Sequence, residues 1–412
     1  MARLILLVIC SLLLWRCQPD ASHQDSRPNI LFIFADDQLQ ETIQALGNQE
    51  VRTPNLDRLV KRGVSFSNAY NMGAWNGAVC TASRHMLVSG RSVWRANEFR
   101  HQWGRGEALD QSWPRLMAQA GYETYMTGKW HVDAKAEDIF DHVTHVRPGM
   151  PPDNWDHHRM MDTLGQILER GGGFSELAGA MPIGYNRPLG PGDNSWSPTD
   201  SSHGGFWSGG QHWSEVLRDD AVGFLEDAGK RETPFFMYLA FNAAHDPRQA
   251  PQSYQDMYDE DQLTLPASWM PLYPFQDQMG GGPTLRDEAL APFPRTEYAL
   301  RVHTKEYYAL ITHMDEQIGA ILDALEATGK ADNTVIFFTA DHGLAMGRHG
   351  LLGKQSMFEH SVKVPFIVSG PGFPAGTKVD HPIYLQDLMA TSLDLAGVEK
   401  PAYVEFESVL PL

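Results

Sequence analysis

The fold of this chain is decided by the stretch Asn29-Ile30-Leu31-Phe32-Ile33-Phe34-Ala35-Asp36-Asp37. Its first seven residues carry no charge and are apolar on nearly both faces, which is typical of a parallel β-strand that helices cover on both sides. Asp36 and Asp37 follow at once, so this strand would deliver two carboxylates to the carboxyl edge of a parallel sheet. Open α/β sheets bind their ligands at that edge.

Four further runs have the same character and are predicted as strands: Tyr122 to Thr127, Phe235 to Phe241, Val335 to Ala340 and Val364 to Val368. Helical patterns alternate with them, at Asn55 to Arg62, Trp113 to Ala120 and about Tyr307 to Ala327. The last pattern repeats apolar residues at helical spacing, and a glycine, Gly329, follows it as a stop. Alternating strands and helices predict an α/β fold in which helical layers cover a sheet.

The composition excludes several classes of protein. The chain has 412 residues, of which 42% are hydrophobic and 20% charged, so disordered and fibrous proteins are excluded. Its 51 acidic residues against 33 basic ones give a formal charge of −18, which argues against a nucleic-acid partner. An anionic ligand would therefore need a local positive pocket inside a negative shell.

The N-terminus predicts export. Arg3 precedes an apolar run from Leu4 to Leu14 that is too short to span a bilayer, and we assign residues 1–20 as an export signal. No later segment is long and apolar enough to be an integral membrane span. Cys17 would suit lipid attachment, but Arg16 stands where such sites have a small residue. Periplasmic, secreted and surface-lipoprotein locations all stay open.

Two irregular stretches, 148–210 and 266–294, are rich in Gly and Pro, and long loops on an α/β scaffold usually shape a binding site. Four tryptophans, at positions 155, 196, 207 and 213, would either stack on sugar faces or pin these loops to the body, and we favour the second role. The final residues, 401–412, resemble the start of a truncated C-terminal subdomain.

Charged residues follow three other predicted strands, and each set alone would suit a helix cap, a turn or the surface. The sets are Gly128-Lys129-Trp130-His131, His245-Asp246-Pro247-Arg248 and Asp341-His342-Gly343. Together with the first strand they place four groups at one sheet edge, which predicts a site. Asp36, Asp37 and Asp341 would repel one another without a cation, and oxygen ligands suit calcium, with magnesium as the alternative.

Cys80 is the one cysteine well inside the mature chain. On its own it is best read as a small buried hydrophobe. A helix is predicted to start near Thr81, however, and this would place Cys80 at a helix N-terminus, where anions and thiolates are favoured. Arg84 lies one turn further on and can face the same anion.

These residues resemble the type I sulfatases of the alkaline phosphatase superfamily. The family signature, C-x-P-S-R followed by T-G-R, is matched by Cys80-Thr81-Ala82-Ser83-Arg84 and by Ser89-Gly90-Arg91. The opening strand with its aspartate pair, the Gly128 segment and a late segment through His349-Gly350 and Gly353-Lys354 also match, in order, between residues 27 and 372. The Asp341-His342 pair is similar to that of iduronate-2-sulfatase-like members.

The resemblance implies an alkaline-phosphatase-like fold with a mixed, mostly parallel sheet, and a catalytic domain over residues 27–400. It implies that a maturation enzyme oxidises Cys80 to formylglycine, whose hydrate attacks the sulfur of a sulfate ester and then expels sulfate as the aldehyde re-forms. The implied cation ligands are Asp36, Asp37, Cys80, Asp341 and His342. The implied catalytic residues are Cys80, Arg84, Lys129, His131, His245 and Lys354.

Ala82 departs from the signature, which has proline there. In the family the cofactor-free maturation machinery prefers proline, whereas the radical-type machinery is more tolerant of alanine, so conversion of Cys80 depends on the host. The leading hypothesis is an exported sulfatase with a sulfated carbohydrate as substrate. The alternatives are a phosphonate or phosphodiester hydrolase of the same fold, and a non-catalytic anion- or glycan-binding protein with an unconverted Cys80.

Overall fold

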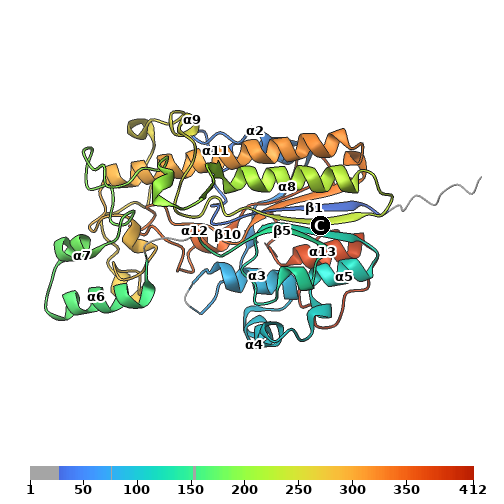
Figure 1. The fold of residues 1–412 in the computed structure, drawn as a ribbon, viewed down its shortest axis with the longest axis horizontal. Helices are drawn as coiled ribbons and strands as arrows, with labels where there is room; N and C mark the ends of the chain where they lie inside the picture. Colours follow the sequence, from blue (N-terminus) through green and yellow to red (C-terminus); the bar gives the residue numbers. More distant parts are fainter. Residues whose placement is uncertain (1–26, 76, 152–154) are drawn as a thin grey trace, which may run out of the picture.

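The computed structural model describes residues 27–412 except 76 and 152–154, so the predicted export signal and Cys17 lie outside the described residues. A sheet of eight strands forms the centre, in the order β12-β2-β11-β9-β1-β8-β4-β5 (Figure 1). Its strands are β1 Asn29–Ala35, β2 Gly63–Phe66, β4 Glu123–Lys129, β5 His142–Arg147, β8 Phe235–Ala240, β9 Thr334–Ala340, β11 Phe366–Ser369 and β12 Thr377–Val379.

Smaller elements complete the fold. Five short strands form two minor sheets: β3 Ala69–Tyr70, β10 Lys363–Val364 and β13 Ile383–Tyr384 in one, β6 Trp207–Ser208 and β7 Gln211–His212 in the other. The helices are α2 Pro54–Arg62, α3 Cys80–Ser89, α4 Val93–Gly104, α5 Trp113–Gln119, α6 His157–Glu169, α7 Phe174–Ala180, α8 Trp213–Ala228, α9 Gln252–Gln255, α10 Gln276–Met279, α11 Glu297–Ala327, α12 Glu359–Val362 and α13 Asp387–Leu395.

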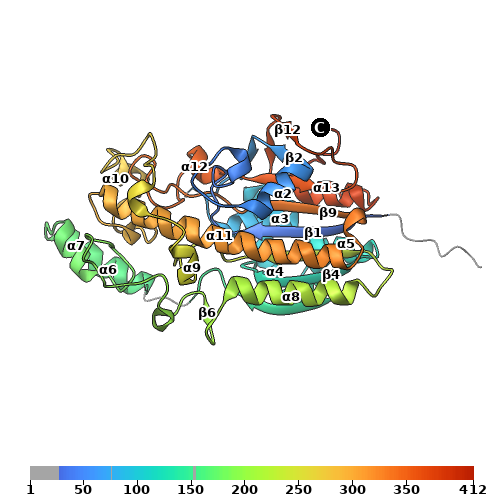
Figure 2. The ribbon, with the colours of Figure 1, turned by 90° about the horizontal axis from the view of Figure 1, so that it is seen from above.

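Strand β1 lies between β8 and β9, parallel to both, and separates two hydrophobic cores. Leu31 and Ile33 point into the core under α2, α8 and α11, whereas Phe32 and Phe34 point into the core under α3, α5 and α13. Figure 1 shows these helices above and below the sheet, and Figure 2 shows α8 and α11 side by side. The apolar pattern of β1 thus has the two-sided burial that the sequence predicted.

The predicted architecture, an α/β layered fold with a mixed and mostly parallel sheet, is confirmed. One direction differs from the expectation, because β11 runs antiparallel to both β9 and β2. The chain between β9 and β11 stays at the carboxyl edge of the sheet and has no crossover helix, so it re-enters the sheet from that edge. The long helix α11 also begins ten residues before the expected Tyr307, at Glu297.

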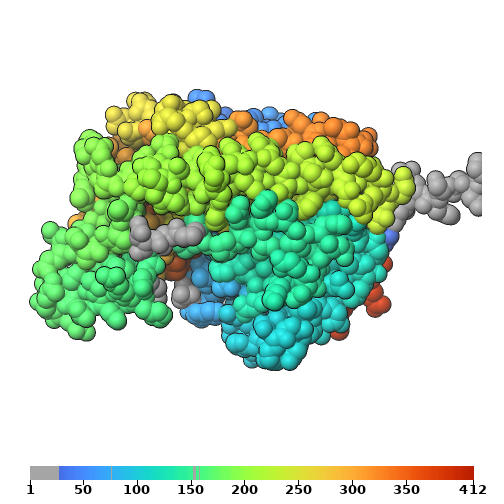
Figure 3. All heavy atoms as spheres, viewed as in Figure 1, coloured from blue at the N-terminus to red at the C-terminus, as the bar shows by residue number. Residues whose placement is uncertain are grey.

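The irregular stretch 148–210 forms a lobe around α6 and α7 with a small core of its own. In the space-filling view this lobe, in green, stands off from the helices on the lower face (Figure 3). The tryptophans act mainly as anchors: Trp213 is buried in the core at the start of α8, and Trp155 stacks on Tyr185. Trp196 packs over the Arg187 guanidinium.

Residues 401–412 contain no helix or strand, and Val404 and Val409 pack into the core on the α3 and α13 side. Among the described residues, no helix combines the length and the apolar character that crossing a membrane requires.

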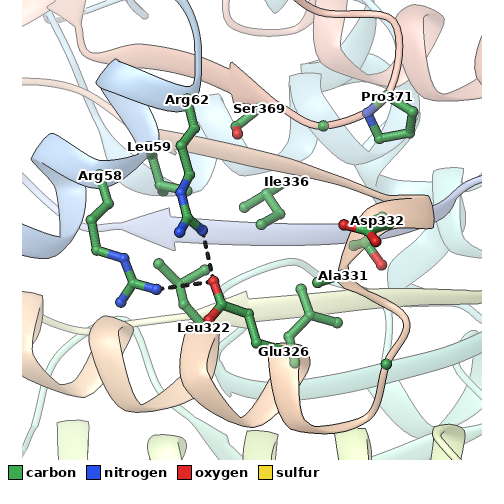
Figure 4. A pocket seen from close by; sticks show the side chains of 14 residues that line it. Arg58, Leu59, Arg62, Leu322, Glu326, Ala331, Asp332, Ile336, Ser369 and Pro371 are labelled. Atoms are coloured by element: carbon green, nitrogen blue, oxygen red, sulfur yellow. Dashed lines mark hydrogen bonds and ion pairs between the residues drawn. The ribbon is translucent and has the colours of Figure 1, made fainter. Parts of the chain in front are cut away.

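A cavity of about 530 Å³ lies at the amino end of β9 and the carboxyl end of β11, between α2 and the end of α11. Arg58 and Arg62 enter it, and both pair with Glu326 (Figure 4). Its charges therefore neutralise one another within the cavity wall. It lies at the opposite end of the sheet from Asp36, so it is separate from the residues that the sequence singled out.

Asp315 of α11 fixes the start of α2, and this contact predicts a stability effect. Its carboxylate accepts hydrogen bonds from the backbone N–H groups of Asn55, at 3.0 Å, and Leu56, at 2.7 Å. Asp315→Ala should lower the free energy of unfolding by about 1–3 kcal/mol, because one buried and one partly buried amide lose their partner. Asp323→Ala, on an exposed turn of the same helix, should change it by less than about 0.5 kcal/mol. Urea unfolding of both variants measures the difference.

Candidate active site

Cys80 is the first residue of α3, and its thiol is buried. The residue before the helix, Val79, is extended and has no side chain that caps the helix, so the first-turn amides face the site without a capping partner. Gly77 lets the loop pass against the chain at Gln355 and Ser356, where a Cβ would lie 2.3 Å from backbone atoms. The predicted place of Cys80 at a helix N-terminus is confirmed.

Five groups gather around this helix start. The carboxylates of Asp36, Asp37 and Asp341, the thiol of Cys80 and the ring of His342 each offer one ligand atom within 4.8 Å of all the others, and all five residues are buried. Asp36 and Asp37 follow β1, and Asp341 follows the neighbouring strand β9. This is the set that the sequence predicted for a cation.

His342 is oriented as a ligand would be. Its Nδ1 lies 3.1 Å from the carbonyl oxygen of Gly343, which can only accept, so Nδ1 carries the hydrogen. Its Nε2 faces the cluster, 3.2 Å from Cys80 Sγ and 3.2 Å from Asp37 Oδ1. Backbone hydrogen bonding of one ring nitrogen while the other faces the ion is the usual arrangement of a metal-ligating histidine.

The charges of the cluster confirm that it suits a cation. Burial first, and then the charge of Asp341, raise the pKa of Asp36 well above its ordinary value, although Lys129 opposes this. Asp36 Oδ1 also has no hydrogen-bond partner. The pKa of His342 is raised to about 9 because Asp341 and Asp37 outweigh its burial. Buried carboxylates that repel one another, with one oxygen that lacks a donor, fit a divalent cation.

Arg84 and Lys129 support the carboxylates from the protein side. Arg84 Nε donates to Asp341 Oδ2 at 3.1 Å, Arg84 Nη1 donates to the Lys129 carbonyl at 2.9 Å, and the guanidinium lies over the Phe34 ring. Lys129 Nζ donates to Asp36 Oδ2. Both side chains are fully buried. Their cationic groups therefore contact the acidic cluster directly.

Lys354 closes the other side of Cys80. Its ammonium group lies 2.7 Å from Asp37 Oδ2 and 3.5 Å from Cys80 Sγ, with Asp287 at 3.8 Å. Burial alone would raise the pKa of the Cys80 thiol, but the charges of Lys129, Lys354 and His342 hold it well below its ordinary value. These three cationic groups thus favour an anionic form of residue 80, as a group that handles an anion requires.

His245 faces the cluster from the segment after β8. Its Nε2 lies 3.6 Å from Asp37 Oδ2, while its Nδ1 lies 2.7 Å from the carbonyl oxygen of Asp246 and therefore carries a hydrogen. His131 follows β4 at a left-handed backbone position, φ 54°, with its ring against Gly149, where a Cβ would clash with the ring. All predicted site residues thus lie around one point at the carboxyl edge.

Several residues of the site were not singled out from the sequence. Asp287 comes from the irregular stretch 266–294, and Arg286 beside it donates to Asp246 at 2.5 Å. Tyr307 of α11 donates to the Asp37 carbonyl at 2.6 Å and accepts from Leu39 N–H at 2.9 Å. Only the loop composition around Arg286 hinted at a site, and nothing distinguished Tyr307 from the other apolar-face residues of its helix.

Comparison with known proteins agrees with this geometry. The sulfatase family model matches residues 28–398. The chain belongs to the sulfatase family. It is therefore a sulfuric ester hydrolase by family, and that family implies a divalent metal and a formylglycine at the site.

Two curated relatives and one solved structure show the range of the likeness. An N-acetylglucosamine-6-O-sulfatase of Bacteroides thetaiotaomicron is 25% identical over 99% of this chain and 75% of its own length. An ulvan-active sulfatase of Formosa agariphila is 27% identical over 94% of this chain and 65% of its own. A phosphonate monoester hydrolase from Silicibacter pomeroyi, 22% identical, covers 93% of this chain and 76% of its own with a TM-score of 0.69, which shows the shared fold.

The cation site predicts a binding experiment. Adding Ca²⁺ or Mg²⁺ to metal-free protein should stabilise it, by about 2.7 kcal/mol when the ion is at 100 times its dissociation constant. Asp341→Asn should remove most of this gain, because one of the three clustered carboxylates is lost. Asp315→Asn, a buried carboxylate on α11, is the matched control and should keep the gain. Thermal unfolding with and without the ion measures both, and an undiminished gain in Asp341→Asn would contradict the assignment.

Proposed function

We propose that this sulfatase removes sulfate from a sulfated carbohydrate, with Cys80 converted to formylglycine and calcium held by Asp36, Asp37, Asp341 and His342. The observation that carries the proposal is the position of Cys80 on the first turn of α3, between Lys354 and His342 and above three buried carboxylates. The names of the two curated relatives support a sulfated glycan as the substrate class.

A cation held by these residues would supply charge that polarises an oxygen of the sulfate ester, and a formylglycine hydrate at residue 80 would supply the nucleophilic hydroxyl and a second hydroxyl through which sulfate can be expelled. Lys354 neutralises negative charge at this point, because its ammonium group already lies 3.5 Å from the position of the Cys80 sulfur atom. The uncapped amides of α3 face the same point and favour an anion there.

The two buried cations, those of Arg84 and Lys129, act through the metal ligands. Arg84 and Lys129 hold the carboxylates of Asp341 and Asp36 in place, so they fix the geometry of the ion's ligands and keep the surroundings of residue 80 positive. The resemblance implied a catalytic role for both residues. Their full burial and their contacts with the carboxylates favour the positioning role instead.

Two histidines are placed for proton transfer. His245 donates its Nδ1 hydrogen to a backbone carbonyl, so a second proton on this ring would sit on Nε2, which faces the reacting centre. We assign to Nε2 the protonation of the leaving sugar oxygen. The proximity of His131 to the Cys80 thiol, whose pKa it helps to lower, suits His131 to take the proton that leaves when sulfate is expelled.

Further parts of the proposal rest on sequence. Arg3 and the apolar run Leu4 to Leu14 support export, and residues 27–400 are proposed as the catalytic domain. A formylglycine-generating enzyme that tolerates Ala82 is the proposed maturation partner. The phosphonate hydrolase alternative shares the fold, but the family model and the named curated relatives favour sulfate esters.

The state of Cys80 is the first test. In protein from the native host, the tryptic peptide spanning residues 63–84 should be lighter than its thiol form by the difference between a CH₂SH and a CHO group. Cys80→Ala should abolish sulfate release while the thermal unfolding curve stays close to that of the wild type. An unmodified thiol in protein from that host would favour the binding-protein alternative, and a fully active Cys80→Ala would refute the mechanism.

The role of His245 predicts a dependence on the leaving group. His245→Ala should lower kcat/KM for a sulfated sugar by about 10²–10³-fold, because an alkoxide leaves poorly without a proton. For 4-nitrophenyl sulfate, whose phenolate leaves unprotonated, the loss should stay below about tenfold. His142 is the first residue of β5 and pairs with Glu123, so His142→Ala is the control and should leave kcat/KM for both substrates unchanged. Equal losses on both substrates would remove His245 from the role of acid.

A further inference from the structure

A small cavity lies next to His245, the histidine that faces the cluster at the carboxyl edge of the sheet. Its wall includes Asp246, whose carboxylate Oδ1 is 3.3 Å from His245 Nδ1, so the cavity and the reacting centre share this residue. The cavity measures about 40 Å³. Because one water needs roughly 10–15 Å³ on this measure, the space suits a single polar group rather than a sugar ring.

The cavity is lined by three arginines, Arg187, Arg248 and Arg286, of which two have carboxylate partners. Arg187 forms two hydrogen bonds with Glu306, at 2.7 and 2.6 Å. Arg286 pairs with Asp246 at 2.5 Å and with the neighbouring Asp287 at 2.9 Å. The positive charges of these two side chains are therefore balanced inside the protein.

Arg248, the third, is different. It is 2% exposed, it forms no ion pair with a carboxylate of the described residues, and its Nε has no hydrogen-bond partner. Among the described residues its side chain forms a hydrogen bond with His303, whose Nδ1 lies 3.1 Å from Arg248 Nη1. A guanidinium taken out of water without a counter-ion is costly, because burial removes the solvation that stabilises its charge.

His303 supplies no negative charge to offset this. Its Nε2 lies 2.8 Å from the Arg187 carbonyl, which can only accept, so Nε2 carries the ring hydrogen and Nδ1 accepts from Arg248. Burial first, and then the charges of Arg187 and Arg248, hold the pKa of His303 well below its ordinary value. The ring is neutral, so the carboxylate whose pKa the charge of Arg248 lowers, that of Asp246, acts from beyond ion-pair distance and is itself paired with Arg286.

We infer that this cavity is an anion subsite, in which Arg248 binds a carboxylate or a second sulfate on the sugar whose sulfate ester is cleaved. The inference rests on the proposed function and narrows its substrate class to sulfated sugars that carry a further anionic group. A planar guanidinium with a free Nε edge matches the paired oxygens of either group. The position behind His245 places this group on the leaving-group side of the scissile bond.

The neighbourhood of Arg248 supports recognition of a sugar substituent. Trp196 also lines the cavity, with its ring packed 3.7 Å from the guanidinium carbon of Arg187, and this packing keeps the paired Arg187–Glu306 unit fixed. Arg187 and Arg286 are held by their carboxylates and form rigid walls, so the charge free to meet a ligand is that of Arg248. In contrast, the cavity near Glu326 at the opposite end of the sheet presents arginines that are already paired (Figure 4).

The test compares sugars that differ in the second charge. The panels are monosulfated uronates, disulfated hexosamines and monosulfated neutral hexoses, with kcat/KM measured for each on formylglycine-containing wild type. The kcat/KM for one of the two anionic panels should exceed that for the neutral panel at least tenfold. A preference for the uronates identifies the carboxylate as the ligand, and a preference for the disulfated hexosamines identifies the second sulfate. Arg248→Gln should lower that preference by about 10- to 100-fold.

Two further variants test whether the preference depends on the charge and the planar shape of the Arg248 side chain. Arg248→Lys keeps the charge without the planar fork and should retain part of the preference. Arg58→Gln, in the exposed pair with Glu326, is the matched control and should leave the preference unchanged. If Arg248→Gln does not fold, product inhibition of the wild type decides: the free uronate or the monosulfated hexosamine product should inhibit at concentrations at least tenfold lower than the neutral hexose.

The outcomes distinguish the two proposals. Equal rates on all three panels, or an undiminished preference in Arg248→Gln, would overturn the anion subsite while sulfatase activity stands. No sulfate release from any panel or from 4-nitrophenyl sulfate, with formylglycine present, would overturn the proposed function, and the subsite as a substrate feature would fall with it.

Discussion

The constraint on which the rest of this structure depends is the burial of three carboxylates, those of Asp36, Asp37 and Asp341, at one point of the sheet edge. Such a cluster is stable only if cations surround it. The chain supplies three permanent ones, Arg84, Lys129 and Lys354, each from a different segment. A divalent cation with a neutral His342 would leave the site net positive, which is the charge that a sulfate ester needs inside a chain of strongly negative total charge.

This balance explains the surrounding packing. The carboxylates must stay fixed to within a hydrogen-bond length of their partners, and the paired, largely apolar strands β1 and β9 give them a rigid base. The long helix α11 contributes as well, because Tyr307 clamps the backbone of Asp37, a residue at φ 59° that would otherwise relax. The carbonyl of Asp341 is held in the same way by Ser83 of α3 at 2.9 Å.

Features that depend on a short stretch of chain could be predicted from the sequence. Runs such as Asn29 to Ala35 are recognised as strands by their apolar residues on both faces, and in a parallel sheet the charged residues at their ends lie at the carboxyl edge. Pairings between distant segments could not be read in this way. The Asp246–Arg286 contact joins a post-strand segment to an irregular loop, and the antiparallel direction of β11 depends on where the chain re-enters the sheet. The burial of Arg84 likewise follows from packing, since its place in the motif is the same whether it faces solvent or the core.

Ala82 stands where the family signature has proline, and its place in the fold shows which interactions this difference affects. Cys80 is the first residue of α3, so Ala82 is the third, within the turn whose amides have no intrahelical partner. The first helical bond of this segment is donated by Ser83, to Val79, at 3.1 Å. A proline at position 82 would therefore remove no helical hydrogen bond, and an alanine adds none. A proline would still remove the Ala82 N–H, one of the first-turn amides that have no capping partner, so alanine keeps one more donor at the helix start. Since the helical hydrogen bonds are the same with either residue, we propose that the substitution matters chiefly when a maturation enzyme recognises this segment.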